Sequence, residues 1–301
     1  MAKPKISFLT VNFNQAGVTV DLLRTLEKLN YAEWECIVVD NGSEPSTLEK
    51  DAKAFSKVKF LRSDENLGFA GGNNIGLSLC EGEYIFLVNN DTELPSEFLD
   101  ELVPFIDSCE NLGALSPRIK YHDEPDLIQY AGSNEMNKIT IRSFGVGFRE
   151  KDIGQYNDIR KTPFTHGAAM LVPRKVLDAV GPMREDYFLY YEELDWCERI
   201  KQEGYDIWYY GTSFLWHKES VSTGRNSPFK TYYINRNRLL FARRNYDAKT
   251  RILNYLYITL IALPKNILGF LLKGEKDQAK AFWRGYLYNL THKSSAHADR
   301  Y

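Results

Sequence analysis

The 301-residue sequence predicts an α/β fold in which helices flank a mostly parallel central sheet, followed by a helical extension at the C-terminus. Three observations carry this prediction. In residues 1–120, short runs rich in Ile, Val and Phe alternate with segments that have apolar residues at helical spacing, which is typical of β-α-β units. From residue 229 onward the pattern is mainly helical. A content of 44% hydrophobic residues is sufficient for a large core.

The expected elements follow the chain in three groups. The first group has strands at residues 5–11, 36–40, 58–61 and 84–88, helices at 18–29 and 47–55, and a glycine-rich segment at 66–76. The second group has a buried strand within 164–172, a helix at 192–202 and two short strands at 206–210 and 213–216. The third group has helices at 229–245, 250–263 and 275–290.

The distribution of charge separates the C-terminal part from the rest of the chain. The whole sequence has 40 acidic and 38 basic side chains, a balance that does not favour a nucleic-acid partner. Residues 225–301, however, carry 15 Lys/Arg and only 4 Asp/Glu. A basic, aromatic-rich tail on an acidic body is typical of contact with an anionic membrane surface. We therefore expect a domain at residues 1–225 and a separate C-terminal region at 226–301.

Cysteine usage and the N-terminus both predict a cytoplasmic protein. The four cysteines, Cys36, Cys80, Cys109 and Cys197, have no CxxC spacing, so they favour reduced thiols over a zinc site or a disulfide framework. The apolar run at residues 6–11 is too short for the core of a signal peptide.

Polar residues follow three of the predicted strands directly. They are Asn12-Phe13-Asn14 after the first strand, Asp40-Asn41-Gly42-Ser43 after the second, and Asn89-Asn90-Asp91 after the strand at 84–88. Parallel sheets bind ligands beyond the carboxyl ends of their strands. These three segments should therefore converge on one crevice.

Two residues are candidates for a metal site. A carboxylate at the edge of a crevice, such as Asp91, suits a hard divalent cation that prefers oxygen ligands. Alternatively, Asn89-Asn90-Asp91 is a turn into a helix with its N-cap near Ser96. His217 ends a predicted strand; a single histidine is more often structural, and it becomes a candidate ligand only if Asp91 binds a metal.

Two further segments have both a functional and a structural interpretation. The glycine-rich segment at 66–76 could bring its backbone close to a phosphate, or it could be a flexible loop. It matches neither the Walker loop nor the dinucleotide fingerprint. Near a predicted helix start, Glu192, Glu193 and Asp195 could compensate the helix dipole, or one of them could act as a general base.

Taken in order, these motifs resemble a known family. The runs VNFN, VVDNGS, ENLGFAGGNNIG, IFLVNNDTEL, HGAAMLVPR, FLYYEELDWCERI and LWHKES occur in this order within residues 5–245. The set resembles glycosyltransferase family 2, and specifically its rhamnosyltransferase-like branch. The resemblance implies a GT-A fold, with a Rossmann-like nucleotide-sugar half at 1–120 and an acceptor half at 121–225. It also implies inverting transfer of a sugar from a nucleoside diphosphate to an acceptor hydroxyl.

The resemblance assigns roles to individual residues. Asp40 would bind the nucleobase, and the remaining residues of the nucleotide-sugar site would be Asn12, Asn14, Asn66, Gly68, Gly71, Gly72, Asn73 and Asn90. Asp91, at the last position of the family's DxD triplet, and His217 would hold Mg²⁺ or Mn²⁺. Glu193 would be the catalytic base, with Glu192 and Asp195 as less favoured candidates. The floor of the sugar and acceptor pocket would be formed by Gly167, Ala168 and Ala169.

The resemblance also implies the substrates. dTDP-L-rhamnose is the leading donor and UDP-hexoses come next, with a glycan or a polyprenyl-linked acceptor in the assembly of a surface polysaccharide. A nucleotidyltransferase is a weaker alternative, because no phosphate-binding loop follows the first strand. A non-catalytic nucleotide-sugar or polysaccharide binder is a third, since Asn89 and Asn90 stand where the DxD triplet begins.

The C-terminal helices have a nearly continuous apolar stretch up to Leu272. It approaches the length needed to cross a bilayer, but Lys265 beside Pro264 disfavours a span. We therefore expect helices that lie on the inner face of the cell membrane. Their headgroup contacts would come from four arginines, Arg236, Arg238, Arg243 and Arg244. A homodimer interface or simple core packing are the alternatives.

Overall fold

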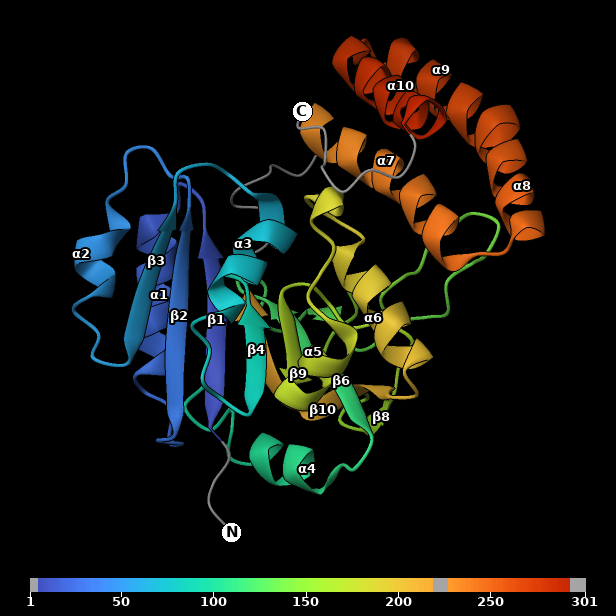
Figure 1. Cartoon of the computed structure of the whole chain (residues 1–301). Coiled ribbons are helices and arrows are strands. Elements are labelled where there is room, and N and C mark those ends of the chain that lie inside the picture. The colour runs from blue at the N-terminus through green and yellow to red at the C-terminus, as the bar shows by residue number, and fades with distance from the viewer. Residues whose placement is uncertain (1–4, 219–226, 293–301) are drawn as a thin grey trace.

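The computed structural model describes residues 5–218 and 227–292, and it confirms the predicted α/β fold (Figure 1). The strands are β1 (Ile6–Asn12), β2 (Trp34–Asn41), β3 (Val58–Ser63), β4 (Tyr84–Val88), β5 (Thr92–Glu93), β6 (Leu112–Tyr121), β7 (Ile128–Tyr130), β8 (Ile159–Lys161), β9 (Ala169–Pro173) and β10 (Asp206–His217). The α-helices are α1 (Ala16–Leu26), α2 (Leu48–Ala52), α3 (Gly68–Leu77), α4 (Leu102–Ser108), α5 (Arg174–Val180), α6 (Glu192–Gln202), α7 (Pro228–Asn245), α8 (Ala248–Tyr257), α9 (Leu263–Leu272) and α10 (Lys276–Thr291). Two shorter helices are η1 (Glu185–Tyr187) and the π-helical turn η2 (Ile258–Ala262).

One ten-stranded sheet runs through the molecule in the order β3-β2-β1-β4-β9-β6-β10-β5, with β7 beside β6 and β8 beside β10. β3, β2, β1 and β4 are parallel, β9 is antiparallel to both of its neighbours, and β6 and β10 are again parallel. Every residue of β2 is buried. Phe8 and Val38 belong to one apolar cluster, whereas the adjacent Leu9 and Val39 belong to the other. The sheet is therefore covered on both faces, as the apolar strands predict.

The glycine-rich segment is a helix, and the alternative prediction of a flexible loop is wrong. Helix α3 begins at Gly68 and packs on β1 and β2 so closely that a side chain would not fit at two of its positions. A Cβ atom at Gly72 would lie 2.8 Å from Val11, and one at Gly76 would lie 2.4 Å from Leu9. These glycines are thus explained by helix-to-sheet packing, which a sequence pattern does not distinguish from loop flexibility.

Gly68→Ala should destabilise the protein by about 2 kcal/mol or more. The backbone at Gly68 is left-handed, and the new methyl group would overlap with backbone atoms of another segment. Gly68 has φ +73°, and its Cβ would be 2.2 Å from the carbonyl oxygen of Phe188. Gly17→Ala in α1 is the matched control, since no described atom lies within 4 Å of its Cβ position. It should be neutral or stabilise by up to about 1 kcal/mol. Urea unfolding measures both; equal stabilities would contradict the close approach.

The pairing of β5 with β10 determines where the third polar segment lies. The two strands predicted at 206–210 and 213–216 are one strand, β10, whose register shifts between Tyr210 and Phe214. In the antiparallel pair, His217 of β10 lies opposite Thr92 of β5. Asn89-Asn90-Asp91 is therefore followed by a strand, and the alternative of a turn into a helix near Ser96 is wrong. The next helix, α4, begins only at Leu102.

The C-terminal helices gather at the end of the molecule toward which β1, β2 and β3 point (Figure 1). α8, η2 and α9 form one continuous helix, Ala248–Leu272, which is long and apolar enough to cross a membrane by length and composition. We call it the outer helix. The helix predicted at 250–263 therefore continues through Pro264 to Leu272. A proline inside a helix clashes with the carbonyl four residues earlier, and here that carbonyl lies in the widened turn η2.

Three of the four arginines that were expected to meet lipid headgroups are buried or held in an ion pair. Arg236 and Arg238 are 0% and 2% exposed. Arg244 forms a bidentate ion pair with Asp186. These side chains hold α7 against the rest of the protein, so the prediction of headgroup contacts is wrong for them. The predicted boundary between residues 225 and 226, and residues 293–301 of the predicted C-terminal region, lie outside the described residues.

Candidate active site

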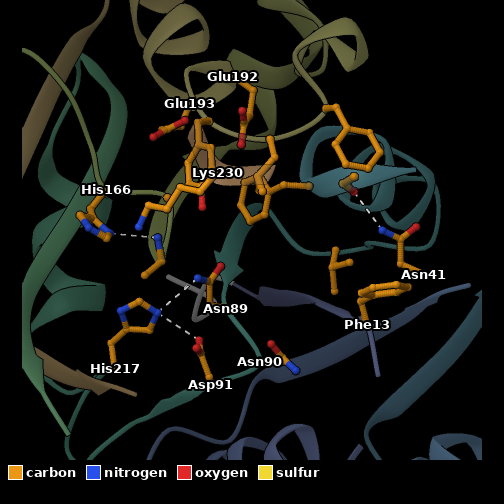
Figure 2. Close-up of a pocket in the computed structure, with 18 of the residues that line it drawn as sticks. Phe13, Asn41, Asn89, Asn90, Asp91, His166, Glu192, Glu193, His217 and Lys230 are labelled. Atoms are coloured by element: carbon orange, nitrogen blue, oxygen red, sulfur yellow. Dashed lines mark hydrogen bonds and ion pairs between the residues drawn. The ribbon is translucent and has the colours of Figure 1, made fainter. Parts of the chain in front are cut away.

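A cavity of about 670 Å³ lies at the carboxyl ends of β1, β2 and β4 (Figure 2). Its wall includes Asn89, Asn90 and Asp91 after β4, and His217 at the end of β10. The segment before β9, the loop before α6 and the first turn of α7 complete the wall. The strand-end segments therefore meet in one crevice, as parallel-sheet geometry predicts.

Asp91 and His217 are brought together from distant segments of the chain. His217 Nε2 lies 3.0 Å from Asp91 Oδ1, and both side chains are almost fully buried. The β5–β10 pair is reinforced next to them, because the Lys218 backbone N–H donates to the Asp91 carbonyl oxygen. The ladder thus fixes two side chains that are 126 positions apart in the sequence.

The hydrogen bonds of His217 determine which ring nitrogen carries the proton. Nδ1 lies 2.8 Å from Gln129 Oε1, a carbonyl oxygen that can only accept, so Nδ1 must donate. Asn89 Nδ2 lies 3.4 Å from Nε2, and an amide nitrogen can only donate. In the neutral ring Nε2 is therefore an acceptor, and it lies beside Asp91 Oδ1, a buried atom for which the described residues supply no hydrogen bond. Two acceptors this close are suited to a cation between them.

This pair fits a divalent cation that retains water or phosphate ligands. Imidazole and carboxylate are both common metal ligands, and a ligating histidine usually donates its second ring N–H to an oxygen, as His217 does to Gln129. Within residues 5–218 and 227–292, no group of three or more His, Cys, Asp or Glu is placed to hold a metal. Asp91 and His217 would therefore supply only part of a coordination sphere.

The opposite wall of the cavity carries the acid pair Glu192 and Glu193, at the start of α6 (Figure 2). Burial raises the pKa of Glu193 to about 7. Burial and the adjacent Glu193 raise the pKa of Glu192 well above its ordinary value. In the described part of the chain, neither Oε2 atom has a hydrogen-bond partner, although both are buried. Glu193 is thus a carboxyl group that can gain or lose a proton near neutral pH.

Asp195 does not line the cavity. Its carboxylate accepts hydrogen bonds from the Tyr187 hydroxyl and from Asn245, and it pairs with Arg184 and Arg199. These partners occupy both of its carboxylate oxygens. The arrangement gives Asp195 a structural role and leaves Glu192 and Glu193 as the acids at the cavity.

The loop before α6 has an unusual backbone that α7 holds in place. Phe188, Tyr190 and Tyr191 all have positive φ angles, which are unfavourable for residues with a Cβ atom. The buried Asn237 of α7 donates from Nδ2 to the carbonyl oxygens of Tyr187, Leu189 and Tyr190 at 2.7–2.8 Å. A single side chain of the C-terminal region thus fixes the loop that positions the acid pair.

At the other end of the cavity, the predicted base-binding residues lie behind the wall. Asp40 is fully buried and accepts hydrogen bonds from Asn12 Nδ2 at 2.9 Å and from the Ser46 hydroxyl at 2.7 Å. Asn14 is exposed and outside the cavity wall. Phe13 and Asn41, their immediate neighbours, line the cavity instead. Successive strand residues point to opposite sides, so each motif contributes to the wall the residue next to the predicted one. Binding of the nucleobase by Asp40 stays a prediction.

The remaining predicted residues divide between the wall and the layer behind it. Asn66, Gly68, Gly167 and Ala168 line the cavity, whereas Gly71, Gly72, Asn73 and Ala169 do not. A Cβ at Gly167 would lie 3.8 Å from the Glu193 carboxyl group, so this position borders the acid pair. The β4–β9 ladder brings the segment there, because the Asn89 backbone N–H donates to the Ala168 carbonyl oxygen.

Three polar residues of the cavity were not predicted from the sequence: Gln129, His166 and Lys230. Gln129 orients His217, but it lies in a stretch with no recognisable motif. His166 directly precedes Gly167; burial, with a contribution from His217, lowers the pKa of its imidazole to about 3 and keeps it neutral. Its Nδ1 accepts from the Ala168 N–H, so the proton is on Nε2. Lys230, in the first turn of α7, points into the cavity between the two walls (Figure 2).

Comparison with known proteins places these features in context. A family model described as glycosyl transferase family 2 matches residues 7–181, more than half of the chain. This range contains the three strand-end segments and the segment from His166 to Ala169.

Two relatives and one solved structure extend the comparison. The low-salt glycan biosynthesis hexosyltransferase Agl10 of Haloferax volcanii is 27% identical over 232 residues, covering 75% of this chain and 73% of that protein. The dTDP-rhamnosyl transferase RfbF of Shigella flexneri is 26% identical over 288 residues, covering 87% and 93%. The mannosyltransferase PcManGT of Pyrobaculum calidifontis, solved with GDP-Man and Mn²⁺, has a TM-score of 0.61 at 14% identity and covers 98% of this chain and 89% of its own. That structural likeness supports the fold alone.

Proposed function

The chain belongs to glycosyltransferase family 2 and transfers a sugar from a nucleotide sugar, and we propose that the reaction is an inverting transfer from dTDP-L-rhamnose. UDP-hexoses are the second donor class. The acceptor is a hydroxyl group of a glycan or lipid-linked saccharide in the assembly of a surface polysaccharide. The rhamnosyl donor is supported by the likeness to the Shigella flexneri relative, whose name specifies dTDP-rhamnosyl transfer.

The observation that carries this proposal is the separation of two chemistries on opposite walls of one cavity. Asp91 and His217 lie on one wall, and Glu192 and Glu193 on the other (Figure 2). A displacement at the anomeric carbon needs a base on the acceptor side and positive charge on the side of the leaving diphosphate. The two walls meet these requirements from opposite directions, as inversion demands.

In the proposed reaction, Glu193 removes the proton from the acceptor hydroxyl. The acceptor oxygen forms its bond to the anomeric carbon while the bond from that carbon to the diphosphate oxygen breaks. The proton remains on the Glu193 carboxyl group, and the electron pair leaves with the nucleoside diphosphate. A pKa near neutrality suits a base that must be ionised before the reaction and protonated after it.

The leaving diphosphate requires compensation of its negative charge. Asp91 and His217 would hold Mg²⁺ or Mn²⁺, which when bound supplies charge neutralisation to the diphosphate. Lys230 points into the same cavity and adds a fixed positive charge. The N–H at His166 Nε2 is a further donor, because Nδ1 accepts from the Ala168 N–H.

Nucleotide binding to the full-length protein tests the proposal. Thermal unfolding is measured with dTDP, UDP and GDP, each with and without Mn²⁺; a ligand at about 100 times its Kd adds about 2.7 kcal/mol to stability. We expect a metal-dependent shift that is larger with dTDP than with UDP, together with dTDP release from dTDP-L-rhamnose when acceptor is present. A larger shift with UDP would move the donor to the UDP-hexoses. Nucleotide binding without sugar transfer to any acceptor would favour a non-catalytic binder.

Gln129→Leu should weaken Mn²⁺ binding by about 10–100-fold, because the variant no longer accepts the Nδ1 proton of His217. Gln129→Glu keeps an acceptor oxygen at the same position and should retain Mn²⁺ affinity. Calorimetric titration of Mn²⁺ in the presence of saturating dTDP measures both. If the leucine variant bound Mn²⁺ as tightly as the wild type, Gln129 would have no part in orienting the ligand.

A further inference from the structure

The outer helix exposes a long apolar face. Eight of its large aliphatic side chains are between 50% and 79% exposed, among them Leu256, Leu260, Leu268 and Leu272. These four recur at intervals of four or eight residues, and the wider π-helical turn η2 reduces the rotation that a regular α-helix would put between Leu256 and Leu272. A continuous row of this kind is far from the scattered exposure of ordinary protein surfaces.

The opposite face of the outer helix is attached to the protein. Asn254 is fully buried and donates to the carbonyl oxygens of Lys138 and Ile139. Ile258, Ala262 and Leu263 follow on the same side and are each less than 10% exposed. A spanning helix would have lipid around most of its circumference, and it would have to break these contacts. The packing therefore favours a helix that lies on a membrane over one that crosses it.

A shallow groove runs beside the apolar face, between the outer helix and α10. Its volume is about 560 Å³, and Leu263, Ile267 and Leu271 form its apolar side. Lys280 and Trp283 of α10 contribute to the opposite rim, and Trp283 is 45% exposed. Tryptophan and lysine beside an apolar groove are the combination found at the boundary between acyl chains and headgroups.

The charge of the same region is complementary to an anionic surface. Residues 248–292 carry seven Lys/Arg and two Asp/Glu. The outer helix itself contains Lys249, Arg251 and Lys265 and no acidic residue. A second protein copy would meet the same excess of positive charge. A bilayer with anionic lipids offers both an apolar interior and a negative surface.

We propose that the outer helix and α10 form a bilayer-docking surface, in which the apolar face enters the headgroup region of an anionic membrane. The lysines then contact phosphate groups, and an acyl chain occupies the groove beside Trp283. This places the protein at the inner face of the cell membrane. Docking itself is independent of the reaction; the use of a lipid-linked acceptor rests on the function proposed above.

Flotation of the full-length protein with vesicles tests the docking. The wild type should float with vesicles of phosphatidylglycerol and phosphatidylcholine, and much less with phosphatidylcholine alone. The triple variant Leu256→Gln/Leu260→Gln/Leu268→Gln should bind the anionic vesicles at least about tenfold more weakly. Lys265→Gln/Lys273→Gln/Lys280→Gln should remove the preference for anionic lipid.

The matched control changes three exposed apolar residues outside the C-terminal helices, in Phe148→Gln/Ile153→Gln/Ile159→Gln. This variant should float like the wild type. Circular dichroism and dTDP binding of all variants show whether the fold and the cavity are intact, so a failure of docking is distinguished from a failure of the proposed function. Equal flotation of the leucine variant and the wild type would overturn the proposal. The proposal would also be overturned if the wild type did not float with vesicles and was a dimer, while the leucine variant was a monomer.

Discussion

Replacing Glu193 by Gln should lower the turnover number by about 10²–10⁴-fold, because the amide cannot take a proton from the acceptor. The donor should still bind, since the proposed nucleotide end of the cavity is on the side of Phe13 and Asn41 (Figure 2). Glu198→Gln is the matched control: it lies on the same helix, pairs with Lys201 and does not line the cavity. Sugar transfer and dTDP binding are measured for each variant. If Glu193→Gln transferred sugar as fast as the wild type, Glu193 would not be the base.

The same carboxyl group predicts how rate and stability depend on pH. Activity should fall as the pH falls through about 7, because Glu193 is then protonated and cannot act as a base. Its folded-state pKa lies above the ordinary value, so its contribution to stability is present at acid pH and is lost as the pH rises through about 7. Glu193→Gln should therefore be at least as stable as the wild type at pH 8. If Glu193→Gln lost both activity and stability at pH 8, Glu193 would have a structural role.

Asp91→Asn should reduce turnover by about 10²–10³-fold and weaken Mn²⁺ binding, since it removes the only carboxylate on its wall of the cavity within the described residues. The shape of the side chain is retained, so the fold should be unaffected. Glu93→Gln is the control, because Glu93 lies two residues away, pairs with Lys218 and does not line the cavity. Transfer rates at increasing Mn²⁺ and calorimetric titration measure the effect. Wild-type rates and Mn²⁺ affinity in Asp91→Asn would show that the cation site is elsewhere.

Much of the fold follows from the sequence because its signals are local. The alternation of apolar strands and helical segments was sufficient to predict the parallel strands β1 to β4. Helix α6 occupies the predicted range 192–202. The convergence of the strand-end segments also follows, since it is a property of parallel sheets. Asp91 could thus be placed at the crevice before any coordinates, whereas the acid pair was placed there only by the family resemblance.

What the sequence could not supply depends on contacts between distant segments. The family resemblance implied that Asp91 and His217 share a site, but nothing near Asp91 indicates the β5–β10 pairing that brings His217 within 3.0 Å. Gln129 has no motif, and only its hydrogen bond to His217 identifies it. The arginines of α7 were assigned to lipid because composition counts charges without their partners; Arg244 has Asp186 as its partner.

The hold of α7 on the loop before α6 determines where this enzyme can be divided and recombined. A chimera joined near residue 226 would combine the acid pair of one parent with the Asn237 of another, and Asn237 is the side chain that binds three carbonyl groups of that loop. A join after Asn245, where α7 ends, keeps the clamp and the acids from one parent. The helices beyond α7 would still have to match it, because the buried Asn289 of α10 donates to the Arg236 carbonyl oxygen.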